Sequence, residues 1–190
     1  MQVPKNIYEQ AEISLTPIKT DMTLEEFLES DLEGYEYVKG EIIPMPAASW
    51  EHGLICSRVF SRLVLYVQEH QLGEVVTPDT GFQVGERVLK PDVAFLSKDR
   101  LPDDHSRACP VSPDLAVEVI SHTDVTRRTI EKAFAYLEAG TQIVWILEPI
   151  GKTVTVYRSE TDIELLTRTD TLTGEDVVEG FSCPVAQLFE

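Results

Sequence analysis

Leu115-Ala116-Val117-Glu118-Val119-Ile120 is an apolar run with a single acid near its centre. A nearly continuous apolar run of this length is typical of a strand that is buried on both faces. Residues 143–147, Ile-Val-Trp-Ile-Leu, form a second run of the same kind. Between the two runs, Thr123-Asp124 and Gly140 are the expected start and end of an amphipathic helix. A strand, a helix and a strand in so short a stretch predict a βαβ unit, and therefore an α/β fold.

The residues on either side of this unit predict further strands and helices. A short helix is expected at residues 24–28, two short strands around Lys39-Gly40 within residues 35–46, and a helix of about five turns with Ser49 as its N-cap. Strands are also expected in residues 74–96 and 152–158, and a strand pair with a helical turn in residues 160–190. Residues 1–20 lack a clean period and are expected as an N-terminal lead-in before a single domain at residues 21–190.

The acidic composition argues against tight, non-specific binding of nucleic acid. Asp and Glu number 33, whereas Lys and Arg number 16, which gives a formal net charge of −17. Proteins that bind DNA through phosphate contacts usually present a basic surface. A small basic cleft, or a contact bridged by a metal ion, is still compatible with this charge.

The cysteines and the N-terminus indicate a reducing compartment. Cys56, Cys109 and Cys183 are odd in number and widely spaced, which fits neither a disulfide framework nor a zinc knuckle. The first residues lack the apolar run of a signal peptide, and no apolar stretch approaches the ~18 residues of a membrane span. We therefore expect a cytoplasmic protein.

Two acids in apolar strands are the first candidates for a functional site. Glu118 is flanked by residues that favour burial, and a buried carboxylate needs a metal ion, a cationic partner or a proton. Asp92 opens a second apolar strand in residues 91–96. Taken singly, these acids also fit a partnered core glutamate and a turn aspartate. Taken together, two such strands can bring the carboxylates within a few ångströms, where both stay ionised only around a cation, and such an oxygen-rich site suits Mg²⁺ or Mn²⁺.

Lys132 is the candidate cation. It lies on the expected helix after Glu118, away from the apolar stripe of that helix, and Arg128 and Tyr136 lie one turn to either side. One interpretation is a solvated helix face, where most lysines are found. The other is a row of side chains that faces the acids and places a cation beside a scissile phosphate.

Other acids are weaker candidates. Glu36 and Glu41 are either a third acid of the site or exposed strand residues. Asp114 shares the strand face of Glu118 but lies about 13 Å from it along the strand, so a strand-start cap is the expected role. Glycine-rich dinucleotide and phosphate-binding motifs are absent from the sequence, as is a nucleophile elbow.

Six stretches, taken in order, carry a resemblance to a known family. They are Tyr35-Glu36-Tyr37-Val38-Lys39-Gly40-Glu41, His52, Pro91-Asp92-Val93-Ala94, and residues 113–121, 132–140 and 144–149. With this set the chain resembles the PD-(D/E)XK nuclease superfamily and, more closely, the Uma-two family of restriction-endonuclease-like proteins. The resemblance spans about residues 23–160 and implies a restriction-endonuclease-like α/β fold, in which a mixed β-sheet is flanked by helices.

The resemblance also implies site residues and a cofactor. Asp92, Glu118 and the backbone carbonyl of Val119 are the implied ligands of Mg²⁺ or Mn²⁺. Glu41, His52 and Tyr136 are possible accessory residues, and a capping or surface role is the alternative for His52. The superfamily places a lysine two positions after the acid, where this chain has Ile120. The Uma-two pattern shares this gap and takes the lysine from the next helix, which here is Lys132.

Three hypotheses follow. The first is a divalent-metal-dependent endonuclease that hydrolyses DNA phosphodiester bonds, in which Lys132 orients the attacking water or neutralises the transition state. The second is a catalytically inactive nuclease-fold module that binds or interacts, which the net charge and Ile120 favour. The third is a structural protein in which the two acids pair with Arg127 or Arg128. A homodimer is also expected, because nuclease-like domains of this size often pair to cut two strands.

Overall fold

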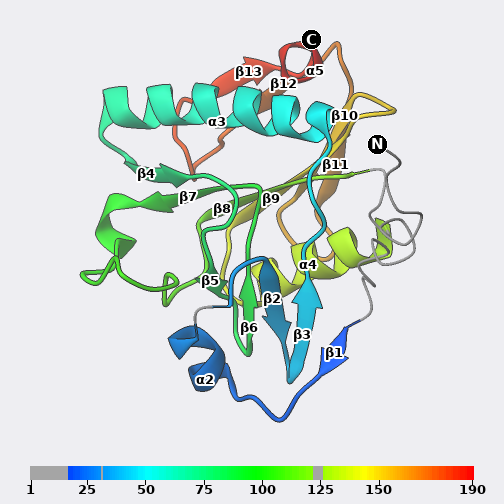
Figure 1. Ribbon diagram of the computed structural model, residues 1–190. Helices are drawn as coiled ribbons and strands as arrows, with labels where there is room; N and C mark the ends of the chain where they lie inside the picture. The colour runs from blue at the N-terminus through cyan, green and yellow to red at the C-terminus, as the bar shows by residue number, and fades with distance from the viewer. Residues whose placement is uncertain (1–16, 31, 122–125) are drawn as a thin grey trace, which may run out of the picture.

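The predicted βαβ unit lies at the centre of the computed structural model, which describes residues 17–30, 32–121 and 126–190 (Figure 1). Strands β8 (Leu115–Val119) and β9 (Ile143–Glu148) pair in parallel, and helix α4 (Thr126–Glu138) lies between them in the sequence. Gly140 has a φ of 97° just after the helix, as expected for a glycine that ends one. The predicted cap at Thr123-Asp124 lies outside the described residues.

The two parallel strands belong to a six-stranded sheet with the order β11-β10-β9-β8-β7-β4. The remaining strands are β4 (Gly73–Val76), β7 (Val93–Ser97), β10 (Thr153–Tyr157) and β11 (Ile163–Leu166), and a short 3-10 helix, η1 (Lys98–Arg100), follows β7. Every neighbouring pair except β8 and β9 is antiparallel, so the sheet is mixed, as predicted.

Helix α3 (Trp50–His70) covers one face of this sheet and lies above it in Figure 1. It begins at the predicted N-cap, where the Ser49 side chain accepts a 3.2 Å hydrogen bond from the backbone N–H of His52. Its buried side chains recur at helical spacing and pack into the main core: Ile55, Val59, Leu63 and Val67. Strands β12 (Thr171–Thr173) and β13 (Ser182–Pro184) and helix α5 (Ala186–Phe189) add to the same core.

Helix α4 covers the opposite face of the sheet. Tyr136 of this helix belongs to a second core cluster together with Ala116 of β8. Side chains alternate along a strand, so Val117 faces α3 whereas Ala116 and Glu118 face α4. This alternation decides that the acid of β8 meets the polar residues of α4.

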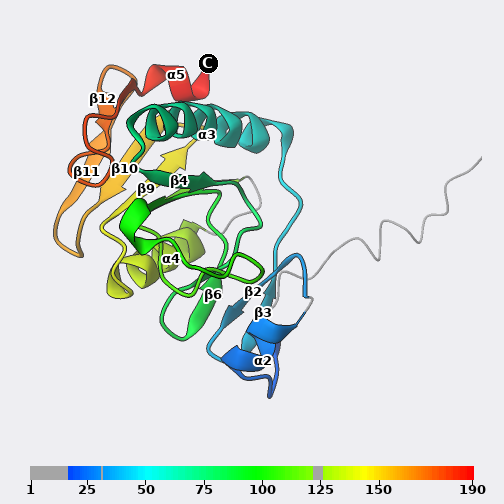
Figure 2. The same ribbon diagram turned by 90° about the vertical axis from the view of Figure 1, so that its left-hand side faces the viewer.

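A second sheet, with the order β1-β3-β2-β6-β5, lies away from α3. Its strands are β1 (Ile18–Lys19), β2 (Tyr35–Val38), β3 (Glu41–Pro44), β5 (Phe82–Gln83) and β6 (Arg87–Leu89). Lys39 and Gly40 turn the β2–β3 hairpin with φ angles of 48° and 86°, as their position predicted. Figure 2 shows this hairpin beside the short helix α2 (Leu24–Glu29), at the far end of the molecule from α3.

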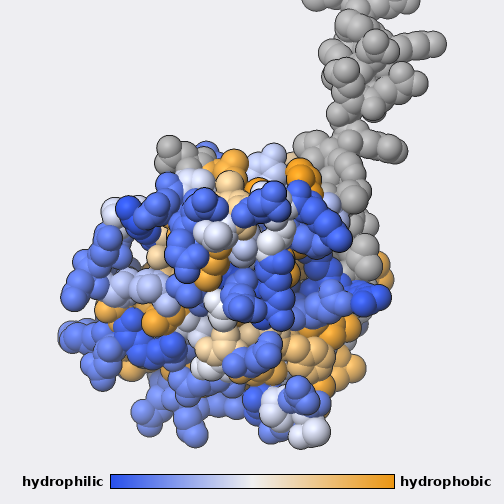
Figure 3. Space-filling model, turned by 90° about the horizontal axis from the view of Figure 1, so that it is seen from below, coloured by the Kyte–Doolittle hydropathy of each residue, from blue (hydrophilic) through white to orange (hydrophobic). Residues whose placement is uncertain are grey.

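The predicted lead-in at residues 1–20 reaches too far along the chain. Ile18 and Lys19 pair with Ile42 and Glu41 of β3, so the folded part begins before residue 21. Figure 3 views the molecule from below, and hydrophilic side chains cover most of that face, with smaller apolar areas between them. Within the described residues, the structure contains no helix that combines the length and the apolar character needed to cross a membrane.

Candidate active site

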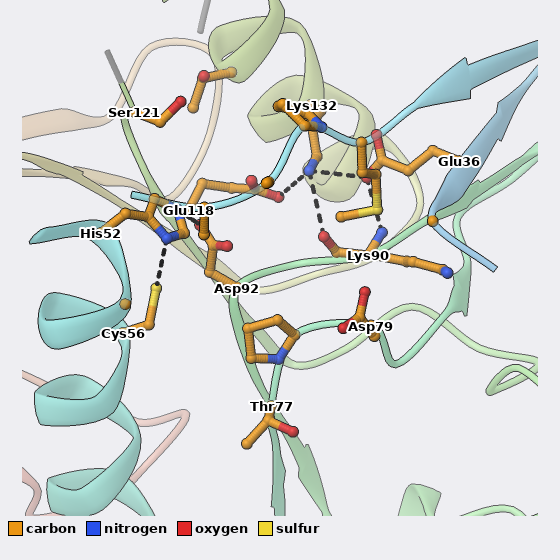
Figure 4. A pocket seen from close by; sticks show the side chains of 18 of the residues that line it. Glu36, His52, Cys56, Thr77, Asp79, Lys90, Asp92, Glu118, Ser121 and Lys132 are labelled. Carbon is orange, nitrogen blue, oxygen red and sulfur yellow. Dashed lines mark hydrogen bonds and ion pairs between the residues drawn. The ribbon is translucent and has the colours of Figure 1, made fainter. Parts of the chain in front are cut away.

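A cavity of about 740 Å³ is lined by residues of α3, α4 and the β2–β3 hairpin and by the ends of β7 and β8 (Figure 4). Its charged lining residues are Glu36, Asp79, Lys90, Asp92, Glu118, Arg128 and Lys132, and His52 and Cys56 of α3 belong to the same wall. Five of the candidate residues from the sequence therefore share this one cavity: Glu36, His52, Asp92, Glu118 and Lys132.

Glu118 lies at the carboxyl end of β8 and is only 7% exposed. Its Oε1 accepts a hydrogen bond of 3.0 Å from the Tyr136 hydroxyl and lies 2.6 Å from Nζ of Lys132. Burial raises the pKa of Glu118 to about 8, because the attraction of Lys132 only partly offsets the loss of solvent and the nearby Asp92 adds to the rise. An added cation would therefore stabilise the ionised form of this carboxylate.

Lys132 is held between two buried glutamates. Its ammonium lies 2.6 Å from Glu118 and 3.0 Å from Oε1 of Glu36, and its side chain is 14% exposed. Burial alone would lower the pKa of Lys132, but the two glutamates outweigh burial and raise it, so the lysine is charged at neutral pH. The interpretation of Lys132 as part of a solvated helix face is therefore wrong.

Glu36 is the acid that the sequence reasoning left open. It is 2% exposed and accepts a hydrogen bond from the backbone N–H of Lys90 at 2.9 Å and one from Arg128 at 3.0 Å. Burial would raise the pKa of Glu36, but Lys132, the Lys90 amide and Arg128 together lower it. Glu36 therefore stays ionised and fixes the ammonium of Lys132 from the side opposite Glu118.

Asp92 is attached to the end of β8 by its side chain. Its Oδ2 accepts a hydrogen bond from the backbone N–H of Val119 at 2.7 Å and lies 3.2 Å from Nε2 of His52. The backbone N–H of Asp92 also donates to the carbonyl of Val117. The carboxylate is thus carried to the same strand end as Glu118, as the two apolar strands predicted.

The family comparison can be set against this geometry. The family described as "Uma2: Putative restriction endonuclease" matches residues 23–186. The chain belongs to the Uma2 family. This is the Uma-two family to which the sequence motifs pointed, and the match extends past the region that those motifs cover.

A solved structure of another protein has a similar fold. It is described as "a putative nuclease belonging to DUF820 from Anabaena variabilis", it is 22% identical to this chain, and the TM-score is 0.79. The superposition covers 88% of this chain and 97% of that one. A search of curated proteins found no match. The predicted restriction-endonuclease-like α/β fold is confirmed.

Two sequence expectations for the Uma2 site need correction. The expected accessory role of Glu41 is the first. Glu41 pairs with Val38 at the turn of the β2–β3 hairpin and lines a separate hollow beside Lys39. Glu36 of the same hairpin lines the cavity instead. The pairing of the two acids with Arg127 or Arg128 is also wrong. Arg127 contacts Glu131, and Arg128 contacts Glu36.

Asp114 has the structural role at a strand start that the sequence predicted, with more partners than a cap requires. It is 1% exposed at the start of β8 and pairs with Arg100 at 2.5 Å. Its carboxylate also accepts hydrogen bonds of 2.8 Å from the Ser97 amide and from Gln142. Asp114 therefore joins β7, β8 and β9 at the sheet end opposite Glu118, which is a structural role.

Cys56 is a cavity residue for which the sequence analysis assigned no role. Its Sγ lies 3.4 Å from Nδ1 of His52, one turn earlier on α3, and the other ring nitrogen of that histidine faces Asp92. Burial raises the pKa of the Cys56 thiol, and Asp92 and Glu118 raise it further. The four-residue spacing of His52 and Cys56 is visible in the sequence, but their meeting with Asp92 depends on the fold.

Proposed function

We propose that this cavity hydrolyses phosphodiester bonds of DNA with the help of a divalent cation, Mg²⁺ or Mn²⁺. Membership of the Uma2 family supports a nuclease, and the contact that carries the proposal is the 2.6 Å pair between Lys132 and Glu118. It places a helix-borne ammonium beside the strand-end acid, which is where the superfamily motif needs its lysine. A lysine with only a structural role could form its ion pair at any position along α4. Lys132 instead lies in the cavity that Asp92 also lines.

The residues present fit a hard divalent cation. The hydrogen bonds and ion pairs that Asp92 and Glu118 form with other described residues use Oδ2 of Asp92 and Oε1 of Glu118. Among these residues, Oδ1 of Asp92 and Oε2 of Glu118 form no such contact and could bind an ion. Asp92 and Glu118, with the carbonyl of Val119, would hold the ion. When bound, the ion supplies a Lewis acid that lowers the pKa of a water molecule and offsets charge on the phosphate.

The remaining steps belong to side chains of the chain itself. Lys132 stays charged and presents its ammonium to the developing negative charge of the phosphate. Glu36 and Tyr136 restrict the movement of Lys132 and Glu118, since one binds the ammonium and the other the carboxylate. His52 orients Asp92 through its ring N–H. These contacts describe a preorganised site whose polar groups need little rearrangement.

Cleavage of supercoiled plasmid DNA tests this function. We expect nicking that requires Mg²⁺ or Mn²⁺, that stops with chelator, and that falls by about 100-fold or more in Asp92→Asn and Glu118→Gln. Asp99→Asn is the matched control, because Asp99 is an exposed acid on η1 outside the cavity. Equal activity in Asp92→Asn and wild type would reject the site.

The second candidate is a nuclease-fold module that binds DNA without cutting it. The net charge of −17 and the presence of Ile120 in place of the motif lysine favour it. DNA binding by a folded wild type that never nicks the plasmid with either ion would support it.

A cytoplasmic location and a homodimer stay predictions. The first rests on three free, buried cysteines.

A further inference from the structure

Three different donor groups meet on the α3 side of the cavity. His52 and Cys56 are one helical turn apart, and Asp92 reaches them from the start of β7. The Sγ of Cys56 lies 3.4 Å from Nδ1 of His52, and Nε2 of the same ring lies 3.2 Å from Oδ2 of Asp92 (Figure 4). One ligand atom from each residue lies within 4.8 Å of the other two. This is the spacing of a cluster that can close on a single ion.

The chemistry of these donors differs from that of the carboxylate pair. Thiolate and imidazole ligands select Zn²⁺ and similar transition-metal ions, whereas Mg²⁺ prefers oxygen. Bonds of about 2.0–2.3 Å to a tetrahedral ion hold ligand atoms roughly 3.5 Å apart. A histidine binds one ion through one ring nitrogen, so only one of the two contacts, 3.2 Å from Nε2 to Asp92 or 3.4 Å from Nδ1 to Cys56, belongs to a given ligand set. That contact already has this size, and the other separations in the set are within 4.8 Å.

We propose that His52, Cys56 and Asp92 form a binding site for a Zn²⁺-class transition-metal ion, which shares Asp92 with the oxygen site proposed for Asp92 and Glu118. All three residues line the cavity, so an ion with three protein ligands keeps a fourth position open to it. The thiol gives up its proton to solvent when it binds the ion.

The position of the cluster supports a built site rather than a chance meeting. The helix turn that carries His52 is fixed by the Ser49 cap, and Cys56 is 6% exposed in the main core. Asp92 is fixed by the Val119 amide, so the three donors come from segments that are already positioned. The proposal goes beyond the proposed function, because binding of this ion does not require that DNA be cleaved.

Cobalt substitution tests the site in the full chain. Co²⁺ bound to a thiolate absorbs strongly in the near ultraviolet, which carboxylate and imidazole ligands alone do not cause. We expect one equivalent of Co²⁺ to give this band with wild type, Zn²⁺ to abolish it at one equivalent, and a large excess of Mg²⁺ to leave it in place. Circular dichroism on each sample reports whether the protein is folded.

The variants decide whether the cluster is the ligand set. Cys56→Ala should lose the band and His52→Ala should weaken Co²⁺ binding at least 10-fold, whereas Cys183→Ala should keep both. Cys183 is the matched control, because it is a free cysteine that is buried like Cys56. No band in folded wild type, a band that survives in Cys56→Ala, or one lost in Cys183→Ala would overturn the site. If Cys56→Ala does not fold, an unchanged affinity in His52→Ala overturns it.

Discussion

The position of the Lys132 ammonium shows that a residue far from the usual motif position can bring its charged group to the same place in the fold. The usual position of the motif lysine is occupied by Ile120, next to the strand that carries Glu118. Lys132 comes instead from α4, and its Nζ reaches 2.6 Å from Glu118 and 3.0 Å from Glu36. Because both glutamates are buried, the lysine also compensates charges that solvent cannot reach. Its structural role and the catalytic role that we propose for it are therefore coupled.

Replacement of Lys132 by Met should separate these roles. We expect Lys132→Met to lower the cleavage rate by about 100-fold or more, since one electrostatic donor is removed from the site. We also expect it to lower the free energy of unfolding by about 3 kcal/mol, because two buried carboxylates lose their partner. Plasmid nicking and urea unfolding in chelator measure the two effects.

Lys98→Met is the control for this pair of measurements, because Lys98 is an exposed lysine on η1. It should leave the cleavage rate unchanged and the free energy of unfolding within about 0.5 kcal/mol of the wild-type value. A Lys132→Met protein that unfolds like wild type and nicks DNA at the same rate would contradict the role that we assign to the lysine.

At the scale of elements, the acids at the two ends of β8 show that position along a strand decides which carboxylate faces the cavity. Asp114 and Glu118 share a face because side chains alternate along the strand, yet they lie at opposite ends of it. Arg100 compensates Asp114 from the η1 end, whereas Glu118 opens on the cavity. The neighbours at each end of the strand, rather than the face, decide which acid is available to a ligand.

Removal of the Asp114 charge should change how stability depends on pH. Burial would raise the pKa of Asp114, but hydrogen bonds from Ser97, Arg100 and Gln142 lower it below 3.8. An acid with a lowered folded pKa adds stability above its unfolded pKa, and that stability is lost as pH falls through the folded pKa. Asp114→Asn should therefore be about 2 kcal/mol less stable than wild type at pH 7. The difference should shrink as pH falls below about 4.

Denaturant unfolding at pH 7 and near pH 3 measures this difference, and Asp103→Asn is the control, because Asp103 is exposed in the loop after η1. Asp103→Asn should follow wild type at both pH values. A stability gap between wild type and Asp114→Asn that stays constant down to low pH would show that the carboxylate adds nothing as an ion.

Local sequence patterns predicted the helices and strands, but they could not predict which distant strands pair with each other. The apolar period after Ser49 and the two apolar runs around α4 depend on nearby residues only, so α3, β8 and β9 were predicted. Glu36 was left undecided because its burial depends on the pairing of Tyr37 with Val88, about 50 residues away. A long-range register of that kind leaves no signal in a single sequence.

The same limit applies to the site. Asp92 and Glu118 were predicted because each interrupts or opens an apolar strand, which is a local feature. Lys132 needed the family resemblance, since a lysine on a helix face does not show which sheet end it approaches. Cys56 was not identified because its thiol becomes part of a cluster only when β7 brings Asp92 beside α3.

At the scale of the whole molecule, the net negative charge opposes the binding of DNA that we propose. The chain carries −17, and the hydrophilic face in Figure 3 belongs to a protein with twice as many acids as basic residues. The cations of the cavity are Lys90, Arg128 and Lys132, and the last two are already paired with glutamates. Any DNA that binds there must do so through few phosphate contacts and through the divalent ion that we propose.

Few contacts predict a weak dependence of DNA affinity on salt. Each phosphate that a protein neutralises adds about −0.9 to the slope of log affinity against log salt. Three cavity cations therefore limit the loss between 50 and 200 mM NaCl to about 40-fold, whereas six to ten contacts would cost about 10³–10⁵-fold. Fluorescence anisotropy of a labelled duplex, with Ca²⁺ in place of Mg²⁺, measures the slope. Lys90→Ala should reduce it by about one contact, and a wild-type slope steeper than three contacts would place DNA on a surface other than this cavity.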